Sequence, residues 1–241
     1  MEVWDSMTSE IKVLATTAMK TSLDELAPDF ERATGNKLSF SFGPSARIAK
    51  MVAEGEQTDV AIVTDHGHDD LTKQGRLVPG IRADIAKSAM ALAVQQGAAR
   101  PDISSAAKFK ETLLAAKSLG MSKPVGGGQS GANLAKIFDR LGITAAMQAK
   151  AVYGPGGPEG LIGHFLVRKE VEIGIQQLPE LMAVSGIDIV GPLPPDVQIM
   201  TVFSAGLSAN AKNVEGANAL IHFLTTPKAV AVIKAKGMEV G

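Results

Sequence analysis

The sequence predicts an α/β fold, and two observations support this prediction. Strand-like apolar runs alternate with segments whose apolar residues recur at helical spacing, three times within the first 75 residues. The alternation then starts again after Gly80, so a second sheet is expected in the middle of the chain. Such repeated strand-helix units are typical of mostly parallel sheets with right-handed crossovers.

The first part of the chain carries three strand-helix units. Three runs are apolar or alternate in polarity and are predicted to be strands: 11–15, 37–42 and 59–63. Two segments show helical spacing of apolar residues and are predicted to be helices: 18–33 and 46–54. The polar segment 64–70 after the third strand is predicted to be a solvated turn.

The second part of the chain repeats this alternation. Strands are predicted at 88–94, 118–122, 149–153, 171–176 and 199–203. Helices are predicted at 105–116, from the glycine-rich stretch 126–131 to Gly142, and from about Gly160 to Arg168. Two C-terminal helices are separated by Thr225–Pro227, where Thr226 suits an N-cap and Pro227 a first helical position. Gly237 suits the end of the last helix.

Composition excludes several classes of function. The 241 residues suffice for one large or two small α/β lobes, and 45% of them are hydrophobic. The 24 Lys and Arg residues are balanced by 25 Asp and Glu residues, so nucleic acid is not expected as a partner. Without cysteine the chain has no disulfide, thiolate nucleophile or cysteine zinc site.

The hydropathy of the sequence indicates in which compartment the protein is expected. No uncharged apolar run approaches the roughly 18 residues of a spanning helix, so the chain is not expected to cross a membrane. Acidic Glu2, Asp5 and Glu10 stand where a signal peptide would have a basic start and an apolar stretch. The sequence as written therefore predicts a cytoplasmic protein, and a periplasmic one if a signal peptide has been removed.

Glycine clusters predict a site for a small anion. The chain has 25 glycines but only one Trp and one Tyr, which favours a site built from backbone amides over one that stacks rings. Four Gly, Ser or Thr clusters lie between a strand and a helix: 16–18, 43–45, 129–131 and 157–160. At the carboxyl ends of parallel strands, helix N-termini direct unpaired N–H groups into one crevice, which suits an anion. The alternative is that each hydroxyl is only an N-cap and each glycine only a turn.

Other motifs give no support to a cofactor, a metal or a nucleophilic triad. Gly126, Gly128 and Gly131 match the spacing of a dinucleotide fingerprint, but no acidic residue follows about 20 positions later, and no cofactor is expected. The polar cluster His66, His68, Asp69 and Asp70 lacks a third distant ligand, and no metal is predicted. The chain also lacks a Gly-x-Ser-x-Gly elbow.

Over nearly the whole chain, the sequence resembles the molybdate-binding branch of the periplasmic solute-binding proteins. The resemblance is carried by the stretches 11–18, 41–65, 126–142 and 172–181. It implies a two-lobed periplasmic-binding-protein-like (type 2) fold with two hinge crossings and a ligand cleft between the lobes. The first lobe would comprise residues 1–85 and 203–241, and the second lobe residues 86–202.

The resemblance also implies ligand contacts. The family's two oxyanion serines fall on Ala18 and Ser45, and the contacts from the second lobe fall at Ser130, near Glu159 and at Gln177. Ala18 lacks a hydroxyl and Gln177 replaces a tyrosine, so a small carboxylate is favoured over molybdate. With the residues of the glycine-rich turns, the predicted ligand-binding set is Thr16, Thr17, Ala18, Ser45, Arg47, Gln129, Ser130, Gly131, Glu159 and Gln177.

Three functions follow as hypotheses. The first is a solute-binding protein that delivers a small anion to the membrane component of an ABC transporter. The second arises because the turns at 43–47 and 129–131 and the segments 189–194 and 234–238 resemble a sub-branch similar to aconitate isomerase. A cytoplasmic isomerase would shift a proton along a small unsaturated polycarboxylate, with Lys20, Glu159 or His164 as the base. The third is a structural or signalling module without a ligand.

Overall fold

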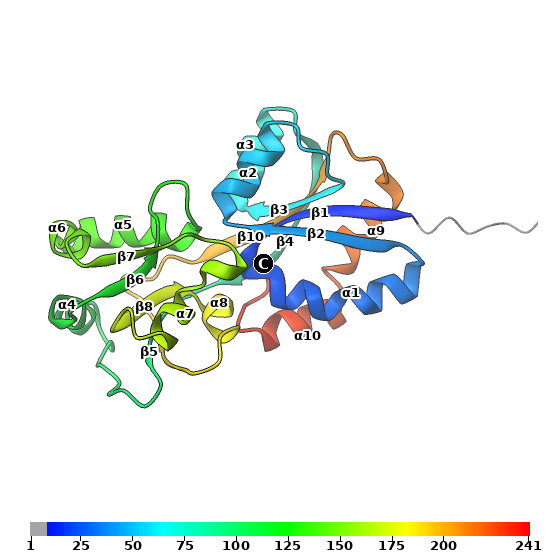
Figure 1. Ribbon diagram of the computed structural model, residues 1–241. Coiled ribbons are helices and arrows are strands. Elements are labelled where there is room, and N and C mark those ends of the chain that lie inside the picture. Colours follow the sequence, from blue (N-terminus) through cyan, green and yellow to red (C-terminus); the bar gives the residue numbers. More distant parts are fainter. Residues whose placement is uncertain (1–8) are drawn as a thin grey trace, which may run out of the picture.

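The computed structural model describes residues 9–241. Residues 1–8, to which Glu2 and Asp5 belong, lie outside the described residues, as does the start of the predicted first lobe. The described chain forms two five-stranded sheets that lie side by side, each covered by helices (Figure 1). The predicted α/β class and two-lobed architecture are confirmed.

The first sheet is built from both ends of the chain. Its strand order is β2 (Lys37–Gly43), β1 (Glu10–Thr16), β3 (Val60–Thr64), β10 (Thr201–Ser208) and β4 (Leu77–Ser88). β1 is parallel to β2 and β3, whereas β10 is antiparallel to β3 and β4. The parallel half brings the carboxyl ends of β1 and β2 together, with Thr16 opposite Gly43.

The second sheet is built from the middle of the chain in the same manner. Its strand order is β7 (Ala151–Gly154), β6 (Leu119–Ser122), β8 (Ile173–Gln177), β5 (Met90–Gln95) and β9 (Ile187–Pro192). β6 is parallel to β7 and β8, whereas β5 is antiparallel to β8 and β9. Both sheets are therefore mixed, with a parallel half that carries the predicted helix starts.

Helices cover both faces of the first sheet. Alternate residues of β1 and β3 point to opposite faces. Ile11, Val13 and Val60 pack with one group of helices: α1 (Lys20–Thr34), α9 (Val214–Phe223) and α10 (Pro227–Ala235). Leu14 and Ala61 pack with a second group on the other face: α2 (Ser45–Ala53) and α3 (Asp65–Lys73). Figure 1 shows the two groups on opposite sides of the sheet.

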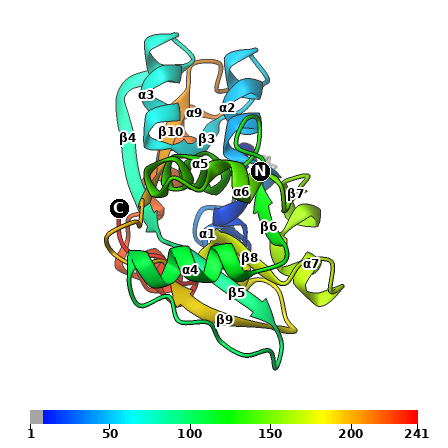
Figure 2. The same ribbon diagram turned by 90° about the vertical axis from the view of Figure 1, so that its left-hand side faces the viewer.

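The second sheet is covered in the same way. Leu92 and Ile175 pack with one group of helices: α4 (Ala106–Ala115), α5 (Gln129–Leu141) and α6 (Thr144–Gln148). Ala91 and Ala93 pack with the other group: α7 (Ile162–Val167) and α8 (Leu178–Met182). α4 and α5 lie in front of the strands in Figure 2, which views the molecule from this end. Each sheet thus has its own hydrophobic core.

Two chain crossings join the sheets. Ala89 is the only residue between β4 and β5, and residues 193–200 connect β9 to β10. The Gln198 amide ties the crossings together, because its Oε1 accepts from Met90 N at 3.1 Å and its Nε2 donates to Met90 O at 2.8 Å. The backbone of Lys87 also pairs with that of Glu239 near the C-terminus. The predicted lobe boundaries at 85/86 and 202/203 stay a prediction.

Several predicted elements differ from the structure. The sequence patterns did not predict β4 or β9, or the short helices α6 and α8, and β10 is longer than the predicted strand 199–203. β4 contains Pro79 and Gly80, which ordinarily mark a turn, and they fit here because their part of the strand is exposed. β9 is a half-buried edge strand without clear alternation.

The prediction of a solvated turn at 64–70 is wrong, because α3 spans Asp65–Lys73. Thr64 caps α3, accepting from Gly67 N at 3.2 Å, and the helix continues to Lys73. His68 is buried, and desolvation lowers its pKa, while Asp69 pairs with Arg82 at 2.7 Å. Within residues 9–241, no three His, Cys, Asp or Glu side chains are grouped so that they could hold a metal ion. No helix in the same range is long and apolar enough to span a bilayer.

Candidate functional site

Two hydroxyls meet at the edge of the first sheet. Thr16 ends β1, and Ser45 begins α2 directly after the Gly43–Pro44 turn that follows β2. Because β1 and β2 are parallel neighbours, their carboxyl ends bring the two side chains together, and Thr16 Oγ1 lies 2.8 Å from Ser45 Oγ. Both side chains are buried. Two of the predicted ligand-binding residues therefore form one polar pair at the start of α2.

A second polar cluster lies at the edge of the second sheet. Ser130, in the first turn of α5, donates to Ser122 Oγ at the end of β6, with 3.3 Å between the oxygens. One turn later, Asn133 Nδ2 donates to Thr201 Oγ1 at 3.3 Å, and Gln177 Nε2 donates to the same oxygen at 2.9 Å. All five side chains are buried. The cluster therefore joins α5, β6, β8 and the start of β10.

Gly131 is required by the close approach of α5 to the preceding strand. A Cβ at this position would lie 2.4 Å from the backbone oxygens of both Ser122 and Lys123. Gln129, at the first position of α5, donates from Nε2 to Asn133 Oδ1 at 3.0 Å. The predicted residues Gln129, Ser130 and Gly131 thus form the first turn of α5, and Gly131 serves its packing.

The two sheets meet at two places near these clusters. Gly156, in the loop before the 3-10 helix η2 (Pro158–Gly160), approaches Pro44 so closely that a Cβ would lie 2.4 Å from Pro44 Cγ. Pro44 directly precedes Ser45. The 3-10 helix η1 (Thr17–Met19), which follows Thr16, contacts α8 from the second sheet. Elements that pack on the two sheets are therefore in contact beside the Thr16–Ser45 pair.

A cavity of about 240 Å³ lies between η1 and α1 on one side and η2, α7 and α8 on the other. It is lined by Thr17, Lys20, Thr21, Asp24, Pro158, Leu161, His164, Pro179, Glu180 and Ala183. Lys20 Nζ lies 2.5 Å from Asp24 Oδ2 and 5.0 Å from the centre of the Phe42 ring. The cavity is lined by residues from elements that pack on both sheets. The lining includes the Lys20 ammonium group and the carboxyl groups of Asp24 and Glu180.

Glu180 lines this cavity and has a raised pKa. It lies in the first turn of α8 and is half-buried. Desolvation raises the pKa of Glu180 to about 7, although hydrogen bonds from the Gln177 backbone and the Gln176 side chain act in the opposite direction. This carboxyl group is therefore close to its titration midpoint at neutral pH.

Two buried polar atoms in this region have no hydrogen-bond partner within residues 9–241. They are Thr17 Oγ1, in the cavity wall, and Gln177 Oε1, at the end of β8. A buried polar atom without a partner costs about 1–3 kcal/mol. Both residues belong to the predicted ligand-binding set. The Thr17 hydroxyl can donate to an anionic ligand, whereas Gln177 Oε1 is an acceptor and needs a donor from the ligand.

The remaining predicted residues are placed differently. The Ala18 methyl group packs into the first hydrophobic core, whereas Arg47 on α2 and Glu159 on η2 are exposed. Of the three predicted bases, Lys20 and His164 line the cavity, and Glu159 does not.

Sequence reasoning missed Asn133, Thr201 and Glu180. Asn133 stands three residues after Ser130, so helical spacing could have placed it beside the predicted site. Pro179 stands three residues after the end of the predicted strand 171–176 and directly precedes Glu180, which is a helix-start signal. Thr201 carried no such signal, because its position depends on the crossing into β10.

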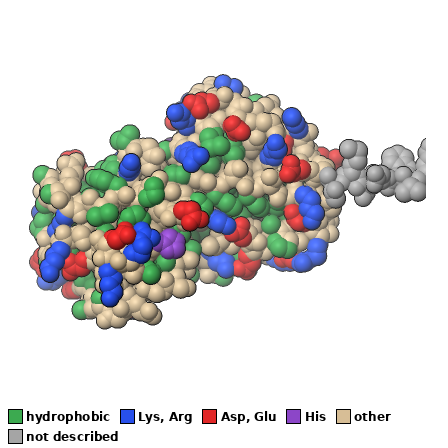
Figure 3. All heavy atoms as spheres, in the orientation of Figure 1, with side chains coloured by type: hydrophobic (Ala, Val, Ile, Leu, Met, Phe, Trp, Pro, Cys, Tyr) green, Lys and Arg blue, Asp and Glu red, His purple; other side chains and the backbone are tan. Residues whose placement is uncertain are grey.

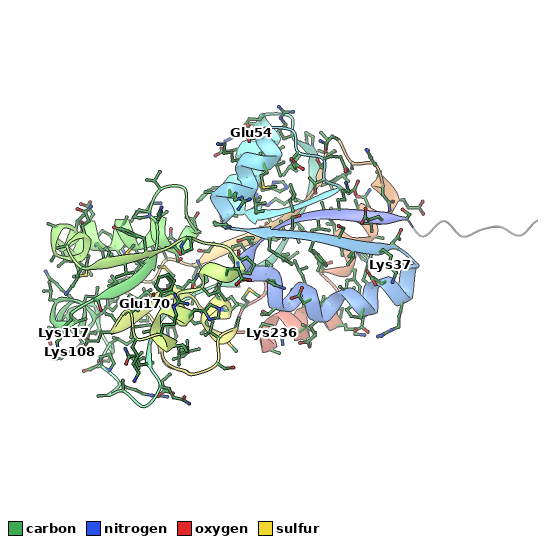
Figure 4. The ribbon with its side chains drawn as sticks, in the orientation of Figure 1. Lys37, Glu54, Lys108, Lys117, Glu170 and Lys236 are labelled. Carbon is green, nitrogen blue, oxygen red and sulfur yellow. The ribbon has the colours of Figure 1, made fainter. Side chains whose placement is uncertain are left out.

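Charged side chains are distributed without a single-sign patch on the visible face. Acidic and basic groups are interspersed over both parts of the molecule in Figure 3. Among the residues labelled in Figure 4, Glu54 and Lys37 lie at the periphery of the first part, and Lys108 and Lys117 at that of the second. This distribution agrees with the balanced composition and leaves the buried polar groups as the distinctive feature of the cleft.

Comparisons with known proteins agree in family and fold. The family described as bacterial extracellular solute-binding protein matches residues 11–239. An aconitate isomerase from a Pseudomonas species is 35% identical over 235 residues, which cover 95% of this chain and 87% of that protein. The molybdate-binding protein ModA of Azotobacter vinelandii is 26% identical over 242 residues, covering 95% of this chain and 89% of that protein.

A solved structure shares the fold over almost the full length. The periplasmic molybdate-binding protein of Azotobacter vinelandii superimposes with a TM-score of 0.79 at 22% identity, covering 96% of this chain and 99% of that one. The two-sheet architecture is therefore that of a periplasmic binding protein.

Proposed function

The chain belongs to the family of bacterial extracellular solute-binding proteins, and we propose that it binds a small anion, a compact carboxylate, in the cleft between its two sheets. The observation that carries the proposal is the pair of buried polar clusters at Thr16–Ser45 and at Asn133–Gln177–Thr201. Their hydroxyl and amide groups suit an anion that is held by hydrogen bonds and not by a fixed counter-charge.

Two features favour a carboxylate over molybdate. The position that resemblance gives to the family's first serine holds Ala18, whose methyl group is part of the hydrophobic core. The position of the family's tyrosine holds Gln177. The 35% identity to an aconitate isomerase, against 26% to a molybdate-binding protein, supports the same choice.

The family membership also supports a partner and a location. A solute-binding protein delivers its ligand to the membrane component of an ABC transporter, which we propose as the partner. The family's description as extracellular favours the periplasm over the cytoplasm.

A thermal-shift series tests the ligand class. Trans-aconitate, cis-aconitate, citrate, molybdate, tungstate and sulfate are each added to the purified chain. A ligand at 100 times its dissociation constant adds about 2.7 kcal/mol, which raises Tm by about 5–10 °C for a chain of this size. We expect such a rise with at least one tricarboxylate and less with the oxyanions. No rise with any of the six would contradict the proposal.

A second candidate function is isomerisation of a small unsaturated polycarboxylate. The observation that favours it is the inter-sheet cavity, where a carboxyl group with a pKa of about 7 lies together with Lys20 and His164. A group that titrates near the working pH is suited to both accepting and donating a proton. Incubation with trans-aconitate, followed by proton NMR, distinguishes the candidates. Formation of cis-aconitate supports isomerisation, and binding without conversion supports transport alone.

A further inference from the structure

We propose that Glu180 carries the proton in this cavity, acting in turn as general base and general acid on a bound unsaturated polycarboxylate. The proposal rests on the isomerase candidate above. Neither the family resemblance nor the sequence patterns assign a role to Glu180.

Glu180 lies close in the chain to one of the polar clusters. Glu180 is the third residue of α8, which directly follows β8, so it lies three residues beyond Gln177 of the second polar cluster. The opposite wall of the same cavity includes Thr17, which follows the Thr16–Ser45 pair. The carboxyl group is thus adjacent in the chain to one polar cluster, and the cavity wall that it faces is adjacent to the other.

The cavity is larger than a bare oxyanion needs. A volume of about 240 Å³ corresponds to about eight water molecules in the liquid, at roughly 30 Å³ each. This is enough for a portion of a ligand with several carbon atoms and a carboxylate. A bare oxyanion of five atoms would leave much of it unfilled.

Charged and titratable side chains line the cavity around Glu180. Lys20 and Asp24 face the cavity from α1, paired with each other, and His164 faces it from α7. An ionised Glu180 would repel the carboxylates of an anionic ligand, whereas a protonated Glu180 would donate a hydrogen bond to one. Because desolvation holds its pKa near neutrality, both forms are accessible without a large energetic cost.

The chemical step balances without any further reactant. The ionised carboxylate of Glu180 takes a proton from a methylene carbon that lies between a carboxylate and a carbon–carbon double bond. The electron pair of that C–H bond forms a new double bond, and the original double bond shifts its pair to the far carbon. Glu180 returns the proton there, which leaves an isomer of the same composition. Lys20 stabilises the negative charge that develops on the ligand carboxylate.

The test compares Glu180→Gln with wild type and with Glu170→Gln as a matched control. Glu170 is an exposed glutamate paired with Arg168 at 2.6 Å, and it lies outside the cavity lining (Figure 4). For each protein, the isomerisation rate of trans-aconitate is measured by proton NMR from pH 5.5 to 8.5, and binding of trans-aconitate by calorimetry. Glutamine keeps the size of the side chain but cannot carry the proton.

We expect Glu180→Gln to lower the rate at least 100-fold, within the range typical of general acid-base groups, while Kd changes less than fivefold. The change of rate with pH near 7 should disappear in this variant and persist in Glu170→Gln.

Three outcomes would overturn the proposal. If wild type and Glu180→Gln isomerise at rates within threefold, Glu180 does not carry the proton, although the isomerase function stands. If Glu180→Gln loses binding in parallel with its rate, Glu180 is a binding group only. If wild type binds trans-aconitate without converting it, both the role of Glu180 and the isomerase candidate fail, while the binding function stands.

Discussion

At the scale of single residues, Ser45 gives the clearest test of the binding site. Ser45→Ala removes a buried hydroxyl at the start of α2 that now pairs with Thr16. A hydrogen bond to a charged group contributes about 1.5–3 kcal/mol, so Kd for the carboxylate ligand should rise about 10- to 100-fold. Titration calorimetry measures this change. The exposed Ser41 on β2 provides the control, because Ser41→Ala should leave Kd within about twofold.

Because the pKa of Glu180 is raised in the folded chain, we expect the stability of the protein to depend on pH. Its pKa rises from 4.5 to about 7 on folding, so the folded chain binds more protons than the unfolded chain between these values. The stabilisation is fully present below pH 4.5 and is lost as pH rises through 7. Between pH 4.5 and 8, the free energy of unfolding of wild type should therefore fall by up to about 3 kcal/mol more than that of Glu180→Gln.

Urea denaturation of the two proteins at several pH values measures this difference. His164, Lys20 and Asp24 face the same cavity in both proteins, so the difference between the two proteins isolates the effect of Glu180. A difference that does not change with pH would show that the Glu180 carboxyl has an ordinary pKa.

Much of the proposed site could be predicted from sequence at the level of residues, and the rest depends on tertiary contacts. Thr16, Ser45 and Ser130 could be predicted because each follows a strand and opens a helix, which is a local pattern. Thr201 could not, because it reaches Asn133 and Gln177 only through the crossing from the second sheet. Arg47 had the right chemistry and position in the chain, yet its side chain is exposed.

At the scale of elements, the loop that contains Gly156 is predicted to control closure of the cleft. Gly156 and Gly157 both have positive φ values, of 82° and 75°, but only Gly156 meets Pro44. Both substitutions place an alanine at a positive φ, which strains the backbone. Gly156→Ala additionally forces the loop away from α2, and overpacking of this kind costs about 1–3 kcal/mol.

We therefore expect Gly156→Ala to raise Kd at least fivefold above that of Gly157→Ala, measured by calorimetry. Equal Kd values would mean that this loop does not need to approach Pro44 for binding.

Element prediction succeeded where periodicity was strong and failed at edges. α5 was predicted correctly between its glycine-rich start and Gly142, because its apolar residues recur at helical spacing over three turns. β4 was missed because Pro79 and Gly80 interrupt it, and α3 was taken for a turn because its residues are mostly polar. In both cases a tertiary contact stabilises the element. β4 pairs with β10, and α3 packs on the first sheet.

At the scale of the whole molecule, the two sheets and their two crossings explain how one small ligand can be held by residues far apart in the sequence. Thr16 and Ser45 come from the first sheet, and Asn133 and Gln177 from the second. The balanced charge of the chain is compatible with an anion site, because the groups that converge are neutral donors.

Calorimetric titration of the purified chain with trans-aconitate tests this account most directly. It predicts saturable binding of one ligand per chain that is weakened at least tenfold in both Ser45→Ala and Asn133→Ala, one variant from each sheet. No saturable heat, or binding that neither variant weakens, would contradict capture of a carboxylate between the two sheets.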